Sequence, residues 1–216
     1  MADDVKGTRA YRSPLRDERA RRTRARMVTA ATELFLDGGF ARTTVPEVAD
    51  RAGVSADLVF HVFGSKRALL KEVLDVGVGG DDEQIDVLER VDPQLLRTEP
   101  DPVRQLGMLA DGIAGQLERV GPLDAMLRDA AVVDPDLAAL RADLQLRQRR
   151  SAMRTIVGWL GGALVLDEDH ATDIVWTLTS PDVHRLLTHD CGWSRVEYAA
   201  WLASSLRAAL LPQAQP

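Results

Sequence analysis

Arginine is concentrated near the start of this 216-residue chain, in a form suited to binding phosphate. Residues 1–72 hold 14 Lys and Arg against 10 Asp and Glu, a formal charge of +4, whereas the remainder holds 13 against 23, a charge of −10. Clustered arginines can neutralise the phosphates of nucleic acid. A solubilising tail is the alternative that charge alone leaves open. The cluster has eight members within eighteen residues: Arg9, Arg12, Arg16, Arg19, Arg21, Arg22, Arg24 and Arg26.

The segment Val45–Gly64 also indicates nucleic-acid binding, because it reads as two short helices joined by a tight turn. Gly53 at the bend can take positive φ, and Ala49 is small enough for the second helix to cross closely. Such a unit presents its second helix to the DNA major groove. Five residues should occupy the exposed side of that helix, whereas Val59, Val62 and Phe63 should face the core. The five are Ser55, Ala56, Asp57, Phe60 and His61.

Local signals predict the helices that position these residues. Apolar residues at helical spacing indicate a helix over residues 19–37, ended by Gly38-Gly39. Thr44 as N-cap, Pro46 in the first turn and Glu47 form a capping box for the next helix. Ser55 and Ser65 can cap the two helices that follow.

The rest of the chain also reads as helices. Asp101-Pro102, Asp134-Pro135 and Ser180-Pro181 each place an N-cap residue before a proline. Ser194 and Glu197 form a second capping box, and no segment shows the alternation of a strand. The predicted fold is all-α, with a mobile arm at 1–18, a helix-turn-helix domain at 19–66 and a larger helical domain at 67–216.

Several other functions find no support in the sequence. There is no apolar run long enough to span a membrane and no hydrophobic leader, so we expect a cytoplasmic protein. Cys191 is the single cysteine and the four histidines lack zinc-ligand spacing, so no metal or other cofactor is expected. Nucleophile, phosphate-loop and dinucleotide motifs are absent, which disfavours an enzyme.

The order of motifs over residues 22–72 resembles the tetracycline-repressor (TetR) family of transcriptional regulators. The resemblance rests on Gly39-Phe40, Thr43-Thr44, Ala52-Gly53-Val54-Ser55, Phe63, Ser65-Lys66 and Leu69-Leu70. The segment from Thr179 to Leu210 also resembles the closing helices of one branch of the family. The resemblance implies a homodimer that reads a palindromic operator and is released when a small-molecule effector binds the larger domain. A constitutive DNA-binding protein without an effector is the alternative.

The resemblance also implies roles for individual residues. Thr44 and Lys66 match residues that contact phosphate in the family, and Arg42 is a further candidate. Asp57 departs from the glycine usual there, and Phe60 replaces a tyrosine. A carboxylate near phosphates is repulsive unless it accepts from a cytosine amino group or pairs with a neighbouring arginine. The operator should therefore have an unusual base preference.

In the larger domain, candidate positions are less specific. Met108, Met126, Trp159 and Trp176 could line an apolar effector cavity, although such residues are often plain core. A cluster of four arginines could bind an acidic ligand: Arg147, Arg149, Arg150 and Arg154. The alternatives are that the cluster forms a solvated face or pairs with carboxylates in salt bridges. By family analogy, the dimer interface should include Val183, Leu186, Leu187, Tyr198, Trp201 and Leu202, although this stripe could equally pack within one subunit.

Overall fold

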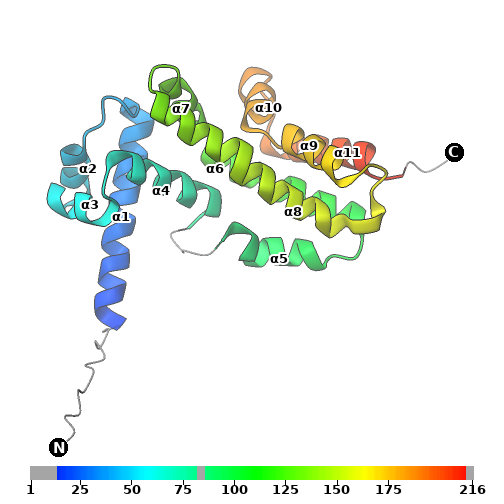
Figure 1. The fold of residues 1–216 in the computed structure, drawn as a ribbon, viewed down its shortest axis with the longest axis horizontal. Helices are drawn as coiled ribbons and strands as arrows, with labels where there is room; N and C mark the ends of the chain where they lie inside the picture. Colours follow the sequence, from blue (N-terminus) through cyan, green and yellow to red (C-terminus); the bar gives the residue numbers. More distant parts are fainter. Residues whose placement is uncertain (1–13, 82–85, 213–216) are drawn as a thin grey trace, which may run out of the picture.

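The computed structural model describes residues 14–81 and 86–212, which fold into helices only, as predicted. Figure 1 shows a small head of three helices joined through α4 to a larger helical body. In the described parts, no helix is both long and apolar enough to cross a membrane. The α-helices are α1 (Pro14–Gly38), α2 (Val45–Ala52), α3 (Ala56–Phe63), α4 (Lys66–Gly79), α5 (Val91–Thr98), α6 (Pro102–Ala131), α7 (Pro135–Ala142), α8 (Arg150–Leu160), α9 (Glu168–Leu178), α10 (Pro181–Arg185) and α11 (Arg195–Leu210).

Four short segments join or extend these helices. Two are single 3₁₀ turns, η1 (Val87–Glu89) and η3 (Gly161–Ala163). The other two are π-helical, η2 (Asp143–Arg149) between α7 and α8 and η4 (Leu186–Asp190) after α10. Such π-helical insertions are rare and often occur at functional sites.

The predicted N-cap residues of the later helices are confirmed. Thr44 with Glu47 and Ser194 with Glu197 both form complete capping boxes. The side chains of Ser55 and Ser65 each accept a hydrogen bond from a backbone N–H in the first turn of the helix that follows. Because these signals depend on residues three positions apart, the sequence is sufficient to place them.

The first helix is longer than expected. Helix α1 begins at Pro14 rather than near residue 19, so residues 14–18, assigned above to the arm, are its first turns; residues 1–13 lie outside the described part. Proline suits a first helical turn. Glu18 accepts hydrogen bonds from Arg21 and Arg22 one turn later, and these bonds lower its carboxyl pKa to about 2. Charged residues that form such i, i+3 and i, i+4 pairs favour helix over coil.

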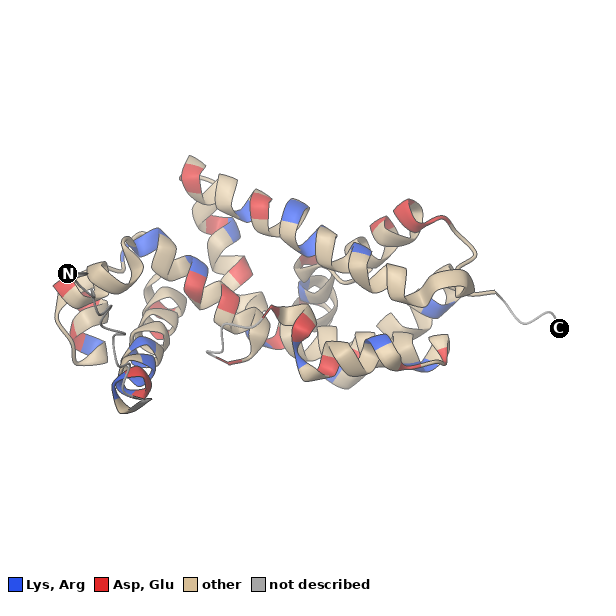
Figure 2. Cartoon of the chain, turned by 60° about the horizontal axis from the view of Figure 1, so that its bottom comes forward, with Lys and Arg blue, Asp and Glu red and all other residues tan. Residues whose placement is uncertain are grey.

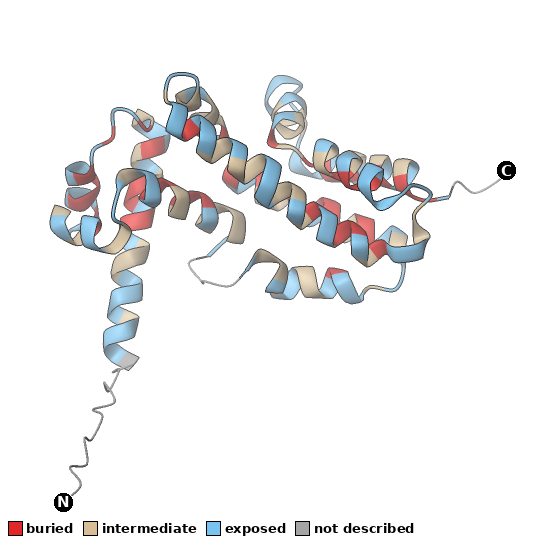
Figure 3. Cartoon of the chain, viewed as in Figure 1, coloured by how far each residue is buried: buried red, intermediate tan, exposed pale blue. Residues whose placement is uncertain are grey.

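A single continuous core runs through head and body (Figure 3). In the head, Phe35, Val48 and Leu69 are fully buried. In the body, the 30-residue helix α6 is central and packs against α4, α7, α10 and α11. Helix α4 packs against both α1 and α6, so the division between residues 66 and 67 stays a prediction.

Candidate DNA-binding surface and body pocket

The turn between α2 and α3 has the geometry that its sequence predicts. Gly53 has φ 65°, in the left-handed region, and Val54 N–H donates to the Ala49 carbonyl at 3.0 Å. Val59 is buried against the head, whereas Val62 and Phe63 are half-buried, the latter beneath the Arg24 guanidinium at 4.7 Å. These contacts hold α3 with one face against the head and one face free.

The free face of α3 carries the residues expected to meet DNA. Asp57, Phe60 and His61 are exposed, and Phe60 keeps 48% of its surface accessible, which is unusual for an aromatic side chain. Ala56 is half-buried, and the exposed Ser55 accepts from Leu58 N–H at 3.2 Å. No hydrogen bond or ion pair to Asp57 occurs within residues 14–81 and 86–212. The exposed surface therefore combines an apolar ring with an unpaired carboxylate.

Thr44 lies exposed at the start of α2. Its backbone N–H and its Oγ1 donate to Glu47 Oε2 at 2.7 and 2.8 Å, and these bonds lower the pKa of the Glu47 carboxyl. Arg42, also exposed, donates from Nε to the Gly38 carbonyl at 2.7 Å. Thr44 thus lies at the end of α2 where backbone N–H groups favour anions, whereas Arg42 is held against the end of α1.

Lys66 has a role that the sequence interpretation missed. Its Nζ donates to the carbonyls of Phe40 and Thr43 at 2.8 and 2.9 Å and lies 4.1 Å from the centre of the Phe40 ring. Partial burial lowers the pKa of the ammonium group. Since an ammonium group has three donors, Lys66 can hold the 40–43 turn and still offer one N–H outward.

The N-terminal half of α1 adds a basic stripe to this head. Figure 2 shows Lys and Arg along these turns. Arg19, Arg22 and Arg26 are exposed and spaced to share one face, and Arg26 Nη1 lies 3.8 Å from where a Cβ on Gly53 would stand. Arg24, by contrast, pairs with Glu72 at 2.8 Å and packs inside the head. The stripe therefore runs from the free end of α1 to the turn before α3.

Removing two arginines of this stripe should reduce the salt dependence of DNA binding. We expect Arg19→Gln/Arg22→Gln to lower the slope of log K against log salt by about 2 for each head that binds DNA, since each phosphate contact contributes about 0.9. The measurement is fluorescence anisotropy on duplex DNA from 50 to 300 mM salt. A matched change in the body, Arg147→Gln/Arg154→Gln, should leave the slope unaltered. Equal slopes for both double variants would show that the stripe is only solvated.

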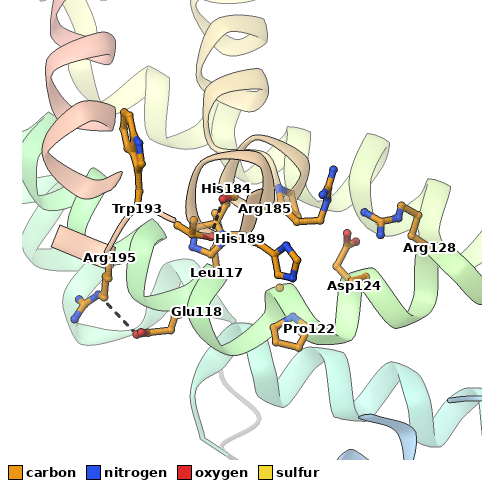
Figure 4. A pocket seen from close by; sticks show the side chains of 14 residues that line it. Leu117, Glu118, Pro122, Asp124, Arg128, His184, Arg185, His189, Trp193 and Arg195 are labelled. Carbon is orange, nitrogen blue, oxygen red and sulfur yellow. Dashed lines mark hydrogen bonds and ion pairs between the residues drawn. The ribbon is translucent and has the colours of Figure 1, made fainter. Parts of the chain in front are cut away.

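The body contains a pocket of about 570 Å³ between α6 and the α10–η4 segment (Figure 4). Leu117, Pro122 and Pro181 supply apolar wall, and His184 stands in the middle with its ring edge-on to Tyr198 at 4.8 Å. Burial lowers the pKa of His184, so the ring is neutral near pH 7. Charged residues from both helices complete the lining.

The effector-cavity prediction named other residues, none of which lines this pocket. Met108, Met126, Trp159 and Trp176 are half-buried and pack against the core. Trp176 donates from Nε1 to the Gln145 carbonyl at 3.0 Å and faces the Arg149 guanidinium at 5.0 Å. The pocket was missed because its lining is mostly charged and small, whereas the prediction looked for Met and Trp.

The predicted dimer-interface residues divide into two groups. Tyr198 and Leu202 are fully buried within the chain, which agrees with the alternative that the stripe packs inside one subunit. Leu186 is 49% exposed, and Val183, Leu187 and Trp201 are half-buried. Val196 at 77% exposure is an apolar residue of this region that the prediction omitted.

A helix-turn-helix head on an all-helical body defines the class of DNA-binding transcriptional regulators, and comparisons with known proteins specify it further. Residues 28–73 match the family model described as "Bacterial regulatory proteins, tetR family". The transcriptional regulator CymR of Pseudomonas putida is 30% identical over 163 residues, covering 74% of this chain and 76% of CymR. The chain therefore belongs to the TetR family.

Other relatives match over less of their length or by fold alone. The regulator TtgR of P. putida is 38% identical over 58 residues, so the match spans 28% of TtgR and 27% of this chain. A crystal structure described as a putative TetR-family regulator from Mesorhizobium loti has TM-score 0.67 at 23% identity, covering 88% of this chain and 96% of the other. The Pseudomonas aeruginosa repressor NalD has TM-score 0.58 at 19% identity, covering 88% and 96% respectively.

Proposed function

We propose that this chain is a ligand-responsive repressor that binds a palindromic operator as a homodimer and is released by a small-molecule effector. The observation that carries the proposal is the position of the pocket on α6, the helix against which α4 packs. Helix α4 starts with Lys66 in the head and ends beside α6. A ligand that displaces α6 would therefore displace the head.

Two contacts support this coupling between body and head. Near its end, α4 approaches α6 closely at Gly77, where a Cβ would lie 3.4 Å from Leu123 Cδ1. At its start, Arg67 pairs with Asp136 of α7 at 2.6 Å. This ion pair is exposed and adds little stability, but it is a direct contact between α7 and α4. Together the contacts link both ends of α4 to the body.

The homodimer would use the exposed apolar residues near α10 and α11. Leu186 and Val196 are exposed large apolar residues, and the half-buried Trp201 packs against Trp193 and Tyr198 on the same helix region. A second copy that covers these residues would remove apolar surface from water, which is the usual source of dimer stability. Tyr198 and Leu202 would support this surface from beneath.

The test of this function is selection of bound sequences from random duplex DNA, followed by titration with candidate effectors. We expect a two-fold-symmetric site and one dimer bound per site by analytical ultracentrifugation. Lack of any sequence preference at low salt would overturn the proposal. If the site is found but no compound in a thermal-shift screen raises the melting temperature and weakens operator binding, the protein is a constitutive DNA-binding regulator.

Asp57 should determine one base of each half-site. Since Asp57 is exposed and unpaired within the described residues, we propose that it accepts a hydrogen bond from a cytosine amino group in the major groove. We expect Asp57→Asn to select a different base at one position, with discrimination of about 1–3 kcal/mol per contact. The measurement is the same selection from random DNA, repeated with the variant.

A control that removes a carboxylate elsewhere in the head tells whether Asp57 reads a base or only repels DNA phosphates. Asp50 is an exposed carboxylate on α2. Asp50→Asn removes the same charge and should keep the wild-type site. If Asp57→Asn also keeps that site and only binds it more tightly, Asp57 repels phosphate and does not read a base.

A further inference from the structure

The body pocket has two chemically different ends. Arg128 and Arg185 stand at one end with the buried Asp124, whereas Trp193, Glu118 and Arg195 stand at the other (Figure 4). The contacts agree with the picture, because Arg128 reaches Asp182 at the start of α10 and Arg195 reaches Glu118 at 3.9 Å. An elongated ligand would therefore meet two arginines at one end and an indole at the other.

The end with two arginines has unused hydrogen-bond donors. Arg185 donates from Nη1 to Asp190 at 2.6 Å, and its Nη2 has no hydrogen-bond partner among the described residues. Arg128 donates to two exposed carboxylates, from Nε and Nη2 to Asp129 at 3.3 and 3.2 Å and from Nη1 to Asp182 at 3.5 Å. An acceptor on a ligand could pair with Nη2 and replace the exposed ion pairs of these arginines, which contribute little to stability.

The acceptors at the same end are already occupied. Asp124 is 6% exposed, and its two oxygens accept from Arg141 at 3.2 Å and from Gln145 at 3.0 Å. A cationic ligand would have to displace Arg141 to reach this carboxylate. Glu118 could attract a cation, but it is exposed at the other end and faces Arg195. Asp129, Asp182 and Asp190 already pair with the two arginines, so this end has no excess positive charge. It offers a ligand spare N–H donors, whereas the oxygens of Asp124 are already used.

We propose that the effector is an amphipathic carboxylate, an inference that rests on the proposed function. Its anionic end would bind Arg128 and Arg185, and its apolar body would lie along Leu117, Pro122 and Trp193. A planar carboxylate matches the geometry of guanidinium groups. The neutral His184 in the middle adds a polar group without a charge. When Arg128 binds the ligand, it would release Asp182. Asp182 also contacts Arg141 of α7 at 3.6 Å, so its release would change the contacts of α7. Helix α7 in turn contacts α4 through the Arg67–Asp136 ion pair.

The experiment is isothermal titration of the full chain, without DNA, using matched probes. The probes are naphthalene-1-acetate and decanoate, each beside its primary amide, and 2-(1-naphthyl)ethylamine as the cation. We expect at least one carboxylate to bind tenfold or more tightly than its amide and the amine to bind no better than the amide. Equal binding of acid and amide, tighter binding of the amine, or no binding of either carboxylate would overturn the proposal.

Variants locate the binding site. Arg185→Gln and, independently, Arg128→Gln should remove the preference for the carboxylate over the amide. Arg154→Gln is the matched control, because Arg154 lies outside the pocket and pairs with Glu168 and Asp169. Circular dichroism checks that each variant is folded. If one of the two pocket variants does not fold, the other still tests the assignment. A preference that survives in both pocket variants would overturn the assignment to this pocket.

Operator binding measured in parallel separates this inference from the proposed function. If a carboxylate binds through Arg185 but leaves operator affinity unchanged, the pocket assignment stands and ligand control of DNA binding fails. If neither carboxylate binds while a symmetric operator is still selected, the anion proposal fails and the DNA-binding function stands.

Discussion

Replacing Lys66 by methionine is expected to weaken operator binding about a hundredfold. The ammonium group holds the turn before α2 through the carbonyls of Phe40 and Thr43, and it has one further N–H for a phosphate. A hydrogen bond that involves a charged group contributes about 1.5–3 kcal/mol. Because the proposed dimer would lose the contact in both heads, even the lower value amounts to about two orders of magnitude. Methionine keeps the unbranched apolar part of the side chain and removes only the ammonium group with its contacts to the two carbonyls and the Phe40 ring.

The measurement is fluorescence anisotropy on the selected operator, with Lys71→Met as the control. Lys71 lies on the same helix and is exposed, with Asp75 as its ion-pair partner one turn away. Losing it should change affinity by less than about threefold, because such exposed pairs contribute little. If Lys66→Met binds as well as Lys71→Met does, then Lys66 neither positions the head nor contacts DNA.

Lysine 66 also illustrates what the sequence can and cannot predict. The helix-turn-helix was predictable because its signals are local: Thr44 and Glu47 are three residues apart, and Gly53 stands at the bend by itself. The partners of Lys66 are backbone carbonyls 23 and 26 residues earlier. Every residue has a backbone carbonyl, so no residue type could have marked these acceptors in advance.

The pocket was unpredictable for a related reason. Its two walls come from α6 and from the α10–η4 segment, which are more than fifty residues apart along the chain, and one wall includes a π-helical turn. A π-helical turn has a wider spacing than an α-helix, so the residues around it point in other directions than α-helical spacing predicts. Thr188 and His189 on η4 line the pocket as a result.

The last helix shows the limit of hydrophobic periodicity. The stripe that contains Tyr198 and Leu202 was correctly predicted as apolar, and in the described residues it packs against α6 within the chain. Periodicity reveals that a face is buried but not by what. Val196 lies just before this stripe, off its helical face, and is 77% exposed.

Replacing Arg149 by methionine is expected to lower the free energy of unfolding by about 3 kcal/mol. The sequence interpretation treated Arg149 as one of four similar arginines, but the structure separates it from the others. It donates to Gln145 Oε1, Thr179 Oγ1 and the Trp176 carbonyl at 2.8, 3.1 and 2.7 Å. Desolvation lowers its pKa to about 10, so it stays charged at neutral pH. Its loss leaves several acceptors unpaired, each at a cost of about 1–3 kcal/mol.

The next residue in sequence is the matched control for this prediction. Arg150 pairs with Asp173 at 2.6 Å on the surface, with 57% of the aspartate side chain exposed, so Arg150→Met should cost no more than about 1 kcal/mol. Urea denaturation followed by circular dichroism measures both variants. Equal losses would mean that the buried hydrogen bonds add nothing beyond a surface ion pair. A larger loss of unfolding free energy for Arg149→Met would show that Arg149 fixes α9 to η2. Arg149 also bonds to the Gln145 side chain, whose amide donates to Asp124 at the pocket wall.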